Sequence, residues 1–132
     1  MTFQGIVKPI YVDIELVNGE DLALARRHII DEKKVKRLSI NILVDARTYM
    51  LAINETIQGQ IQFPVVGKKE VRFADGRIVE CDIVAPVEIK YKYQLTVCRA
   101  IVLPGDSQPT FGSVPFDAMN RLIYPLYHRT FL

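Results

Sequence analysis

Polar and apolar side chains alternate along two stretches in the first third of the chain. In residues 11–16 every second side chain is apolar, and the same spacing recurs at positions 38, 40, 42 and 44. A period of two is typical of a strand that buries one of its faces. The pattern therefore predicts strands at residues 11–16 and 35–44, and the second strand ends on Asp45.

Two short helices are predicted close to these strands. Residues 20–27 are acidic at their start and basic at their end, which complements the helix dipole. The dipeptide Asn18-Gly19 before them indicates a turn. Asn54 is a candidate N-cap for a second helix, which Gly59 keeps short.

The second half of the chain is typical of β-structure. Residues 71–73 and 77–81 flank Ala74-Asp75-Gly76, and Asp-Gly is a common signal for a hairpin turn. The other predicted elements are strands at residues 83–91 and 95–103, a helix at residues 116–122 that Pro115 begins, and an extended piece at residues 123–132.

About seven strands and one to three short helices, with no alternation of strand and helix, predict an all-β fold. We expect it to be mainly antiparallel and built as a small closed barrel or a sandwich. At 132 residues the chain is long enough to close a core, and we expect residues 1–132 to form a single domain.

Composition favours a soluble globular protein. Hydrophobic residues make up 49% of the chain and charged residues 24%, no apolar run approaches the ~20 residues of a membrane span, and the first residues do not read as a signal peptide. Cys81 and Cys98 lie outside any CxxC pattern, so we expect two small buried side chains in a reducing cytoplasm. His28 and His128 are far apart in sequence, so we expect no metal and no other cofactor.

Charge argues against a nucleic-acid surface. The formal net charge is +2, and the basic clusters at residues 26–28 and 33–37 are interleaved with acidic side chains. A solvated charged loop is the simpler interpretation, so we expect neither nucleic acid nor membrane as a partner. A small barrel that binds nucleic acid through residues 33–37 stays open as the alternative.

Asp45 is unusual because it is the single acidic residue in residues 42–51, a run of mostly apolar side chains. A carboxylate in such a setting needs a partner, a shifted pKa or a role in chemistry. The order of motifs around it is informative. A strand ending in Leu-Val-Asp is followed by a loop with Thr and by Met-Leu-Ala-Ile. The hairpin with Ala-Asp-Gly at its tip comes next. The strand Ala-Ile-Val-Leu-Pro-Gly follows it, and Phe-Gly-Ser-Val-Pro then precedes a short helix.

This order resembles the retropepsin-like aspartic proteases, most closely the small bacterial single-domain members, over roughly residues 11–125. The resemblance implies a closed acid-protease barrel with a flap hairpin. It implies Asp45 as the catalytic aspartate and Thr48 as the fourth motif residue, whose hydroxyl can bond the carboxylate. The other implied site residues are Ala46 and Arg47 in the active-site loop, Ala74, Asp75 and Gly76 at the flap tip, and Phe111, Gly112 and Ser113 in the second motif.

The resemblance also implies a symmetric homodimer, because the chemistry of the family needs two carboxylates and this chain offers one Asp45. Residues 3–10 and 123–132 would interleave at the interface, and the substrate or ligand would be a polypeptide. One of the two carboxyls keeps its proton while the other acts as the base.

The signature Asp-Thr/Ser-Gly reads Asp45-Ala46-Arg47 in this chain. Ala46 lacks the hydroxyl that bonds across the dimer axis, and Arg47 replaces a glycine beside the substrate. A cation within ~4–6 Å of a carboxylate lowers its pKa by about 1–3 units, which favours a dyad with both groups ionised. Two alternatives remain: an aspartic endopeptidase with an adapted loop, and a pseudoenzyme that acts as a structural or peptide-binding dimer.

Overall fold

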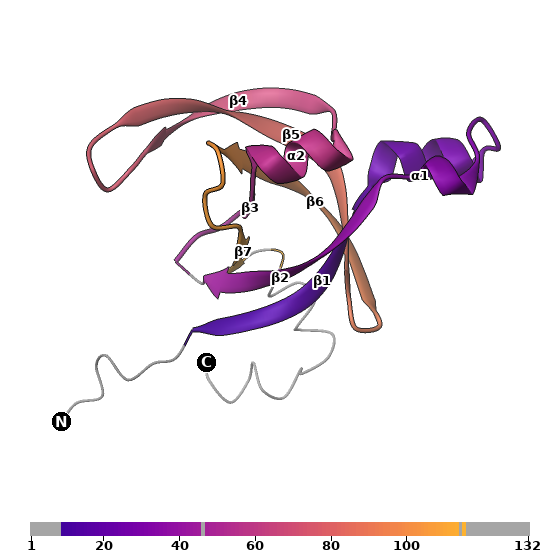
Figure 1. The fold of residues 1–132 in the computed structure, drawn as a ribbon, viewed down its shortest axis with the longest axis horizontal. Helices are drawn as coiled ribbons and strands as arrows, with labels where there is room; N and C mark the ends of the chain where they lie inside the picture. Colours follow the sequence, from indigo (N-terminus) through magenta and orange to yellow (C-terminus); the bar gives the residue numbers. More distant parts are fainter. Residues whose placement is uncertain (1–8, 46, 114, 116–132) are drawn as a thin grey trace.

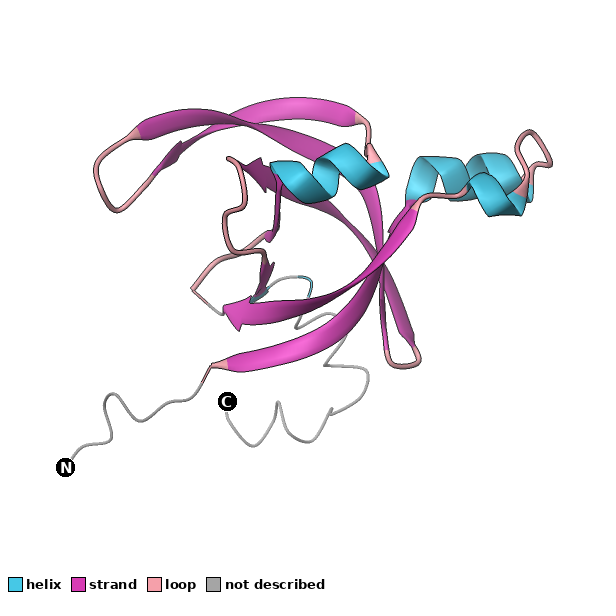
Figure 2. Ribbon diagram, in the orientation of Figure 1, coloured by secondary structure: helices cyan, strands magenta, loops and turns pink. Residues whose placement is uncertain are grey.

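The computed structural model describes residues 9–45, 47–113 and 115. Within them the chain forms seven strands, two α-helices and one 3₁₀ turn, shown in Figure 1 and by type in Figure 2. In chain order the elements are β1 (Ile10–Asn18), α1 (Gly19–Arg26), η1 (Glu32–Lys34), β2 (Arg37–Asp45), β3 (Leu51–Asn54), α2 (Glu55–Ile61), β4 (Val65–Arg72), β5 (Ile78–Tyr91), β6 (Gln94–Leu103) and β7 (Thr110–Gly112).

Six of the strands close into a barrel. They are hydrogen-bonded in the order β1-β2-β7-β3-β6-β5, and pairing of β1 with β5 closes the ring. Most pairs are antiparallel, but β2–β7 and β3–β6 are parallel. The prediction of an all-β, mainly antiparallel closed barrel is therefore confirmed.

Strand β5 pairs with three other strands. Its first half pairs with β4, its second half with β6, and residues 87–90 with β1. The sequence predicted two strands here, at residues 77–81 and 83–91, and that division was wrong, because β5 is continuous from Ile78 to Tyr91. The irregularity lies between Val84 and Val87, where the ladder with β6 shifts. Pro86 in that interval has no N–H to donate, which fits an interrupted ladder.

The apolar side chains divide between two faces. The barrel interior holds a large cluster around Phe63, Phe111 and Ile53, all buried. A smaller cluster forms on the outer face of the same sheet, beneath the β4–β5 hairpin, and contains Ala52 and Ile101. Because neighbouring side chains on a strand point to opposite faces, Ile53 fills the barrel while Ala52 serves the outer cluster.

Both α-helices begin at an asparagine whose side chain accepts a hydrogen bond from the first turn, but only one of these caps was predicted. Asn54 caps α2 as predicted, since its Oδ1 accepts from the N–H of Ile57 at 2.8 Å. The predicted turn at Asn18-Gly19 was wrong, because β1 runs directly into α1. Asn18 is the N-cap of α1, accepting from the N–H of Asp21 at 3.1 Å. An Asx side chain that caps a helix gives the same sequence signal as a turn residue.

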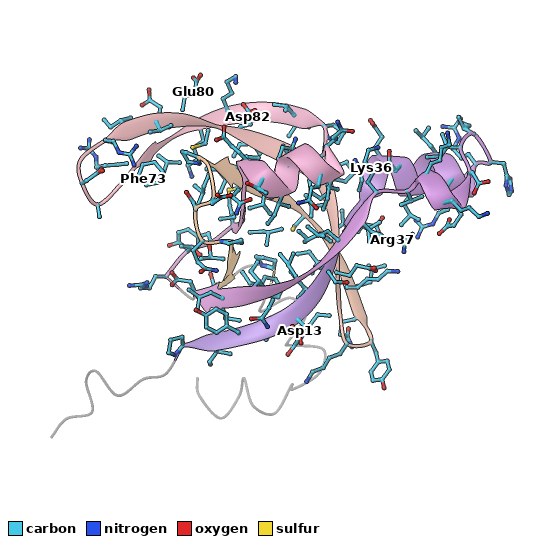
Figure 3. The ribbon with its side chains drawn as sticks, viewed as in Figure 1. Asp13, Lys36, Arg37, Phe73, Glu80 and Asp82 are labelled. Atoms are coloured by element: carbon cyan, nitrogen blue, oxygen red, sulfur yellow. The ribbon has the colours of Figure 1, made fainter. Side chains whose placement is uncertain are left out.

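The basic segment that raised the nucleic-acid alternative, residues 33–37, lies in η1 and at the start of β2, close to α1 and on the far side of the barrel from the hairpin tip (Figure 1). Its charges are partly paired with acids: Lys36 lies 3.0 Å from Asp21 and Arg37 lies 3.1 Å from Glu32 (Lys36 and Arg37 are labelled in Figure 3). The helix predicted at residues 116–122, the extended piece at 123–132 and most of residues 3–10 lie outside the described residues.

Candidate functional site

Asp45 is the last residue of β2, and the parallel strand β7 lies beside it. The register pairs Val44 with Phe111 and Asp45 with Gly112. The two motifs that are 67 positions apart in sequence are thus neighbours in the sheet. Ser113 continues this contact, since its N–H donates to the carbonyl of Thr48 at 2.8 Å.

The loop after Asp45 packs closely on Gly112. A Cβ atom placed on Gly112 would lie 2.7 Å from the carbonyl carbon of Tyr49 and 2.8 Å from that of Met50. Real Cβ atoms are essentially never so close to backbone, so only glycine fits at this position. The strand pairing therefore fixes the start of the loop at Asp45, and the close approach fixes Tyr49 and Met50 against β7.

Arg47 binds the carboxylate of Asp45 from three positions. Its backbone N–H donates to Oδ1 at 3.0 Å, its Nε donates to Oδ1 at 2.9 Å, and its Nη2 donates to Oδ2 at 3.1 Å. The Asp45 side chain is 15% exposed, whereas that of Arg47 is 89% exposed. The guanidinium therefore covers the carboxylate from the solvent side.

This arrangement lowers the pKa of Asp45 below its usual value. The hydrogen bonds from the Arg47 side chain are the largest cause and the Arg47 backbone N–H is the next, while partial burial opposes them. Bidentate arginine–carboxylate pairs are the stronger, directional kind of ion pair. Asp45 is thus held as the anion, with both oxygens occupied.

Thr48 does not bond the carboxylate, contrary to the expectation for the fourth motif position. Its hydroxyl donates to the main-chain carbonyl of Asp45 at 3.0 Å, and its N–H donates to the same carbonyl at 3.2 Å. The carboxylate oxygens are already used by Arg47, so the threonine closes the turn instead. Ala46, the second motif residue, lies outside the described residues.

The predicted hairpin exists, and β4 and β5 are joined through residues 73–77. The N–H of Phe73 donates to the carbonyl of Arg77 at 2.8 Å, and Gly76 has φ of +90°. Asp75 accepts from the N–H of Arg77 at 3.0 Å and from its Nε at 2.8 Å, and the Arg77 guanidinium lies 5.1 Å from the centre of the Phe73 ring (Phe73 is labelled in Figure 3). These bonds lower the pKa of Asp75, the backbone N–H being the largest cause. The tip, with Ala74, is a locally ordered turn.

A groove runs between this hairpin and the loop that follows Asp45. It contains two adjoining cavities of about 440 and 480 Å³, which share Tyr49, Met50 and Lys69 in their walls. The floor of the second cavity is the outer apolar cluster, with Ala52, Ile101 and Leu103. Residues 69–73 form its wall on the hairpin side.

Only some of the predicted site residues line this groove. Thr48 lines the second cavity, whereas Asp45 and the hairpin tip are not among the described residues that line either cavity. The sequence did not single out Tyr49, Met50 or Lys69. Residues 65–72 form an edge strand of which only the last part was predicted, because Gly67 and Lys69 interrupt the apolar alternation.

Among the described residues, no group of three or more His, Cys, Asp or Glu side chains is arranged to hold a metal ion. No helix in the described part of the chain has the length and apolar character to cross a membrane. Comparison of the sequence with models of protein families and with curated proteins gives no match.

Proposed function

We propose that this chain is a retropepsin-like aspartic protease homologue that works as a homodimer, holds extended polypeptide in the groove beneath the β4–β5 hairpin, and hydrolyses it weakly or not at all. The observation that carries the proposal is the Asp45–Arg47 pair. A carboxylate stands where the catalytic aspartate of that family is expected, and a guanidinium occupies both of its oxygens.

Three features support the kinship. Asp45 ends a strand opposite Gly112 of a parallel strand, Gly112 has room for no side chain, and a hairpin borders an apolar groove next to the loop. These features involve the residues that the resemblance singled out, namely Asp45, Gly112 and the hairpin with Asp75 at its tip. Fold likeness alone does not carry activity, which depends on the chemistry of the site.

The chemistry expected of such a site needs one ionised and one protonated carboxyl. In a homodimer each subunit would contribute one Asp45 and one Arg47. The lowered pKa of Asp45 favours two carboxylates over the mixed pair. The general acid that protonates the scissile amide would then be missing, and the position of the attacking water would be contested by the guanidinium.

Retention of a groove without efficient hydrolysis is consistent with peptide binding. Among the described strands β4 pairs only with β5, so within this part of the chain its other edge is open, and residues 69–72 of β4 line the second cavity. An extended chain can add to such an edge as a further strand. Tyr49, 75% exposed, offers an aromatic surface at the same place.

The test is a gain of function. The double variant Ala46→Thr with Arg47→Gly restores the family signature, and we expect it to cleave unfolded casein or a quenched-fluorescence peptide library between pH 4 and 7. Wild type and Asp45→Asn should both be inactive or nearly so, and adding Asp45→Asn to the double variant should abolish the new activity. Sedimentation equilibrium of each protein reports whether the dimer is present.

A working endopeptidase is the second candidate, favoured by the exposure of Arg47. Solvent screens so exposed an ion pair, and a substrate could displace the guanidinium. In that case wild type cleaves as well as the double variant and loses activity on Asp45→Asn. This outcome would replace the pseudoenzyme with an active protease.

A further inference from the structure

We infer that the groove selects extended peptides in which acidic and apolar side chains alternate, and that Lys69 and Arg99 read the acidic ones. The inference rests on the proposed function in one respect, namely that the groove holds polypeptide. It adds the chemical class of the ligand and the residues that choose it.

The first cavity has basic and apolar walls. Lys68, Lys69 and Arg99 line it, and none of the described residues in its wall is acidic. Lys68 already has an acidic partner, because its Nζ lies 2.7 Å from Oδ1 of Asp82 on β5 (Asp82 is labelled in Figure 3). Lys69 and Arg99 make no ion pair and no side-chain hydrogen bond with any other described residue. The cavity therefore presents two uncompensated cations.

The floor beside these cations is apolar. Ile83 lies in the first cavity and Ile101 in the second, and both belong to the outer cluster beneath the hairpin. An anion alone would leave this surface uncovered, and an apolar chain alone would leave the cations unpaired. The chemistry that satisfies both is an apolar side chain next to a carboxylate.

The spacing of β6 fits an extended ligand. Arg99, Ile101 and Leu103 occupy every second position of the strand, so their side chains share one face at intervals of about 6.4–6.8 Å. An extended peptide lying along β6 presents its own side chains on one face with the same interval. A peptide of period two can therefore meet Arg99 with an acid and Ile101 or Leu103 with an apolar residue.

Main-chain pairing along the edge of β4 supplies affinity that does not depend on sequence. Selectivity must then come from the side chains in the walls. Over both cavities the cations are Lys68, Lys69, Arg72 and Arg99, and the acid is Glu70. This modest positive excess on an apolar floor suits an acidic peptide better than the polyanionic backbone of a nucleic acid, which needs a denser basic surface.

The test uses three fluorescein-labelled octapeptides that alternate valine with glutamate, with glutamine or with lysine. Anisotropy titrations with the full chain at low salt should rank glutamate over glutamine over lysine, with about a tenfold preference for glutamate over glutamine that shrinks as salt rises. Lys69→Glu and Arg99→Glu should each reduce that preference about fivefold. The matched control is Lys34→Glu, which makes the same charge change at an exposed lysine of η1.

The outcomes are separable. Equal binding of all three peptides overturns the acidic selectivity while leaving a peptide groove, whereas binding of none overturns the proposed function and this inference together. A preference that survives both charge reversals overturns the assignment to Lys69 and Arg99. Tighter binding of a labelled oligothymidylate than of the glutamate peptide overturns the choice of peptide. Circular dichroism checks that the variants fold, and Lys69→Gln and Arg99→Gln replace any that does not.

Discussion

Gly112 on β7 lies against the backbone of Met50, which belongs to the loop that leaves Asp45. A Cβ atom at residue 112 would be 2.8 Å from the carbonyl carbon of Met50. The neighbouring atoms are main chain, held by the pairing of β7 with β2 and of β3 with β6, so they have little freedom to move. The geometry of the whole candidate site therefore depends on the absence of one side chain.

We expect Gly112→Ala to lower the free energy of unfolding by about 2 kcal/mol or more, because overpacking against fixed backbone forces the strands apart. Urea denaturation followed by circular dichroism measures the change. Gly59→Ala is the matched control: a Cβ there meets nothing within 4 Å inside α2, so the variant should be neutral or up to about 1 kcal/mol more stable. Equal effects at both sites would contradict the close packing of Gly112.

The strands could be predicted from the sequence wherever one face is buried and the other is exposed to solvent. This holds for β1 and β2, and for the hairpin, where turn chemistry marked the tip. It fails for the first part of β4, because an exposed edge strand has no need of apolar alternation. It also fails at Asn18, whose capping role depends on a helix that only the fold positions.

The sequence indicated which motifs lie together at the candidate site, but it did not indicate how Asp45 is bonded there. The sequence pointed to Asp45 and Gly112 through the order of the motifs, and the structure brings the two into register. The orientation of Arg47 had no signal in the sequence, since a guanidinium next to a carboxylate in the chain can turn toward it or away. The residues of the groove walls were missed because nothing in the sequence distinguishes Lys69 and Arg99 from other surface cations. Only the folded sheet brings the two together at one cavity.

The hairpin tip should depend on Gly76. With φ of +90° it has a backbone conformation that L-residues adopt at a cost, so Gly76→Ala should destabilise the tip by about 1–2 kcal/mol. Hydrogen exchange of the Phe73 amide, which bonds the Arg77 carbonyl, reports the local opening. Gly67→Ala on the same hairpin is the control, because its Cβ would meet only Ile83 at 4.0 Å. Unchanged exchange in Gly76→Ala would contradict the turn geometry.

Cys98 should be an unreactive thiol in the folded protein. Cys98 is only partly buried, unlike Cys81, and lines the first cavity, but desolvation raises its pKa to about 12, so the thiolate fraction at pH 8 is on the order of one in 10⁴. The pKa of Cys81 is also raised, chiefly by burial. We expect slow alkylation by iodoacetamide at pH 8, faster alkylation as pH rises, and rapid reaction of both thiols in urea. Cys98→Ser isolates the signal of Cys81, and a Cys98 rate equal to that of free cysteine at pH 8 would overturn the prediction.

The pKa of Asp45 is the most direct measure of its ion pair with Arg47. Because Arg47 depresses the folded-state pKa, we expect a ¹³C-carboxyl NMR titration to place Asp45 below the usual value of about 3.9, and Arg47→Gly to move it upward. Asp75, which has its own partner in Arg77, is the internal control and should titrate identically in both proteins.

The lowered pKa of Asp45 also determines how the Arg47 pair affects the free energy of unfolding at different pH values. A group whose pKa is lower in the folded than in the unfolded state stabilises the fold above the unfolded value, and that contribution disappears as pH falls through the folded value. Arg47→Gly should therefore unfold more easily than wild type near neutral pH, and the difference should close in acid below both pKa values. The difference will be small, because the guanidinium is largely exposed. A gap that persists unchanged into strong acid would show that Arg47 acts on the loop by packing, and the charge pairing at the centre of the proposed function would lose its support.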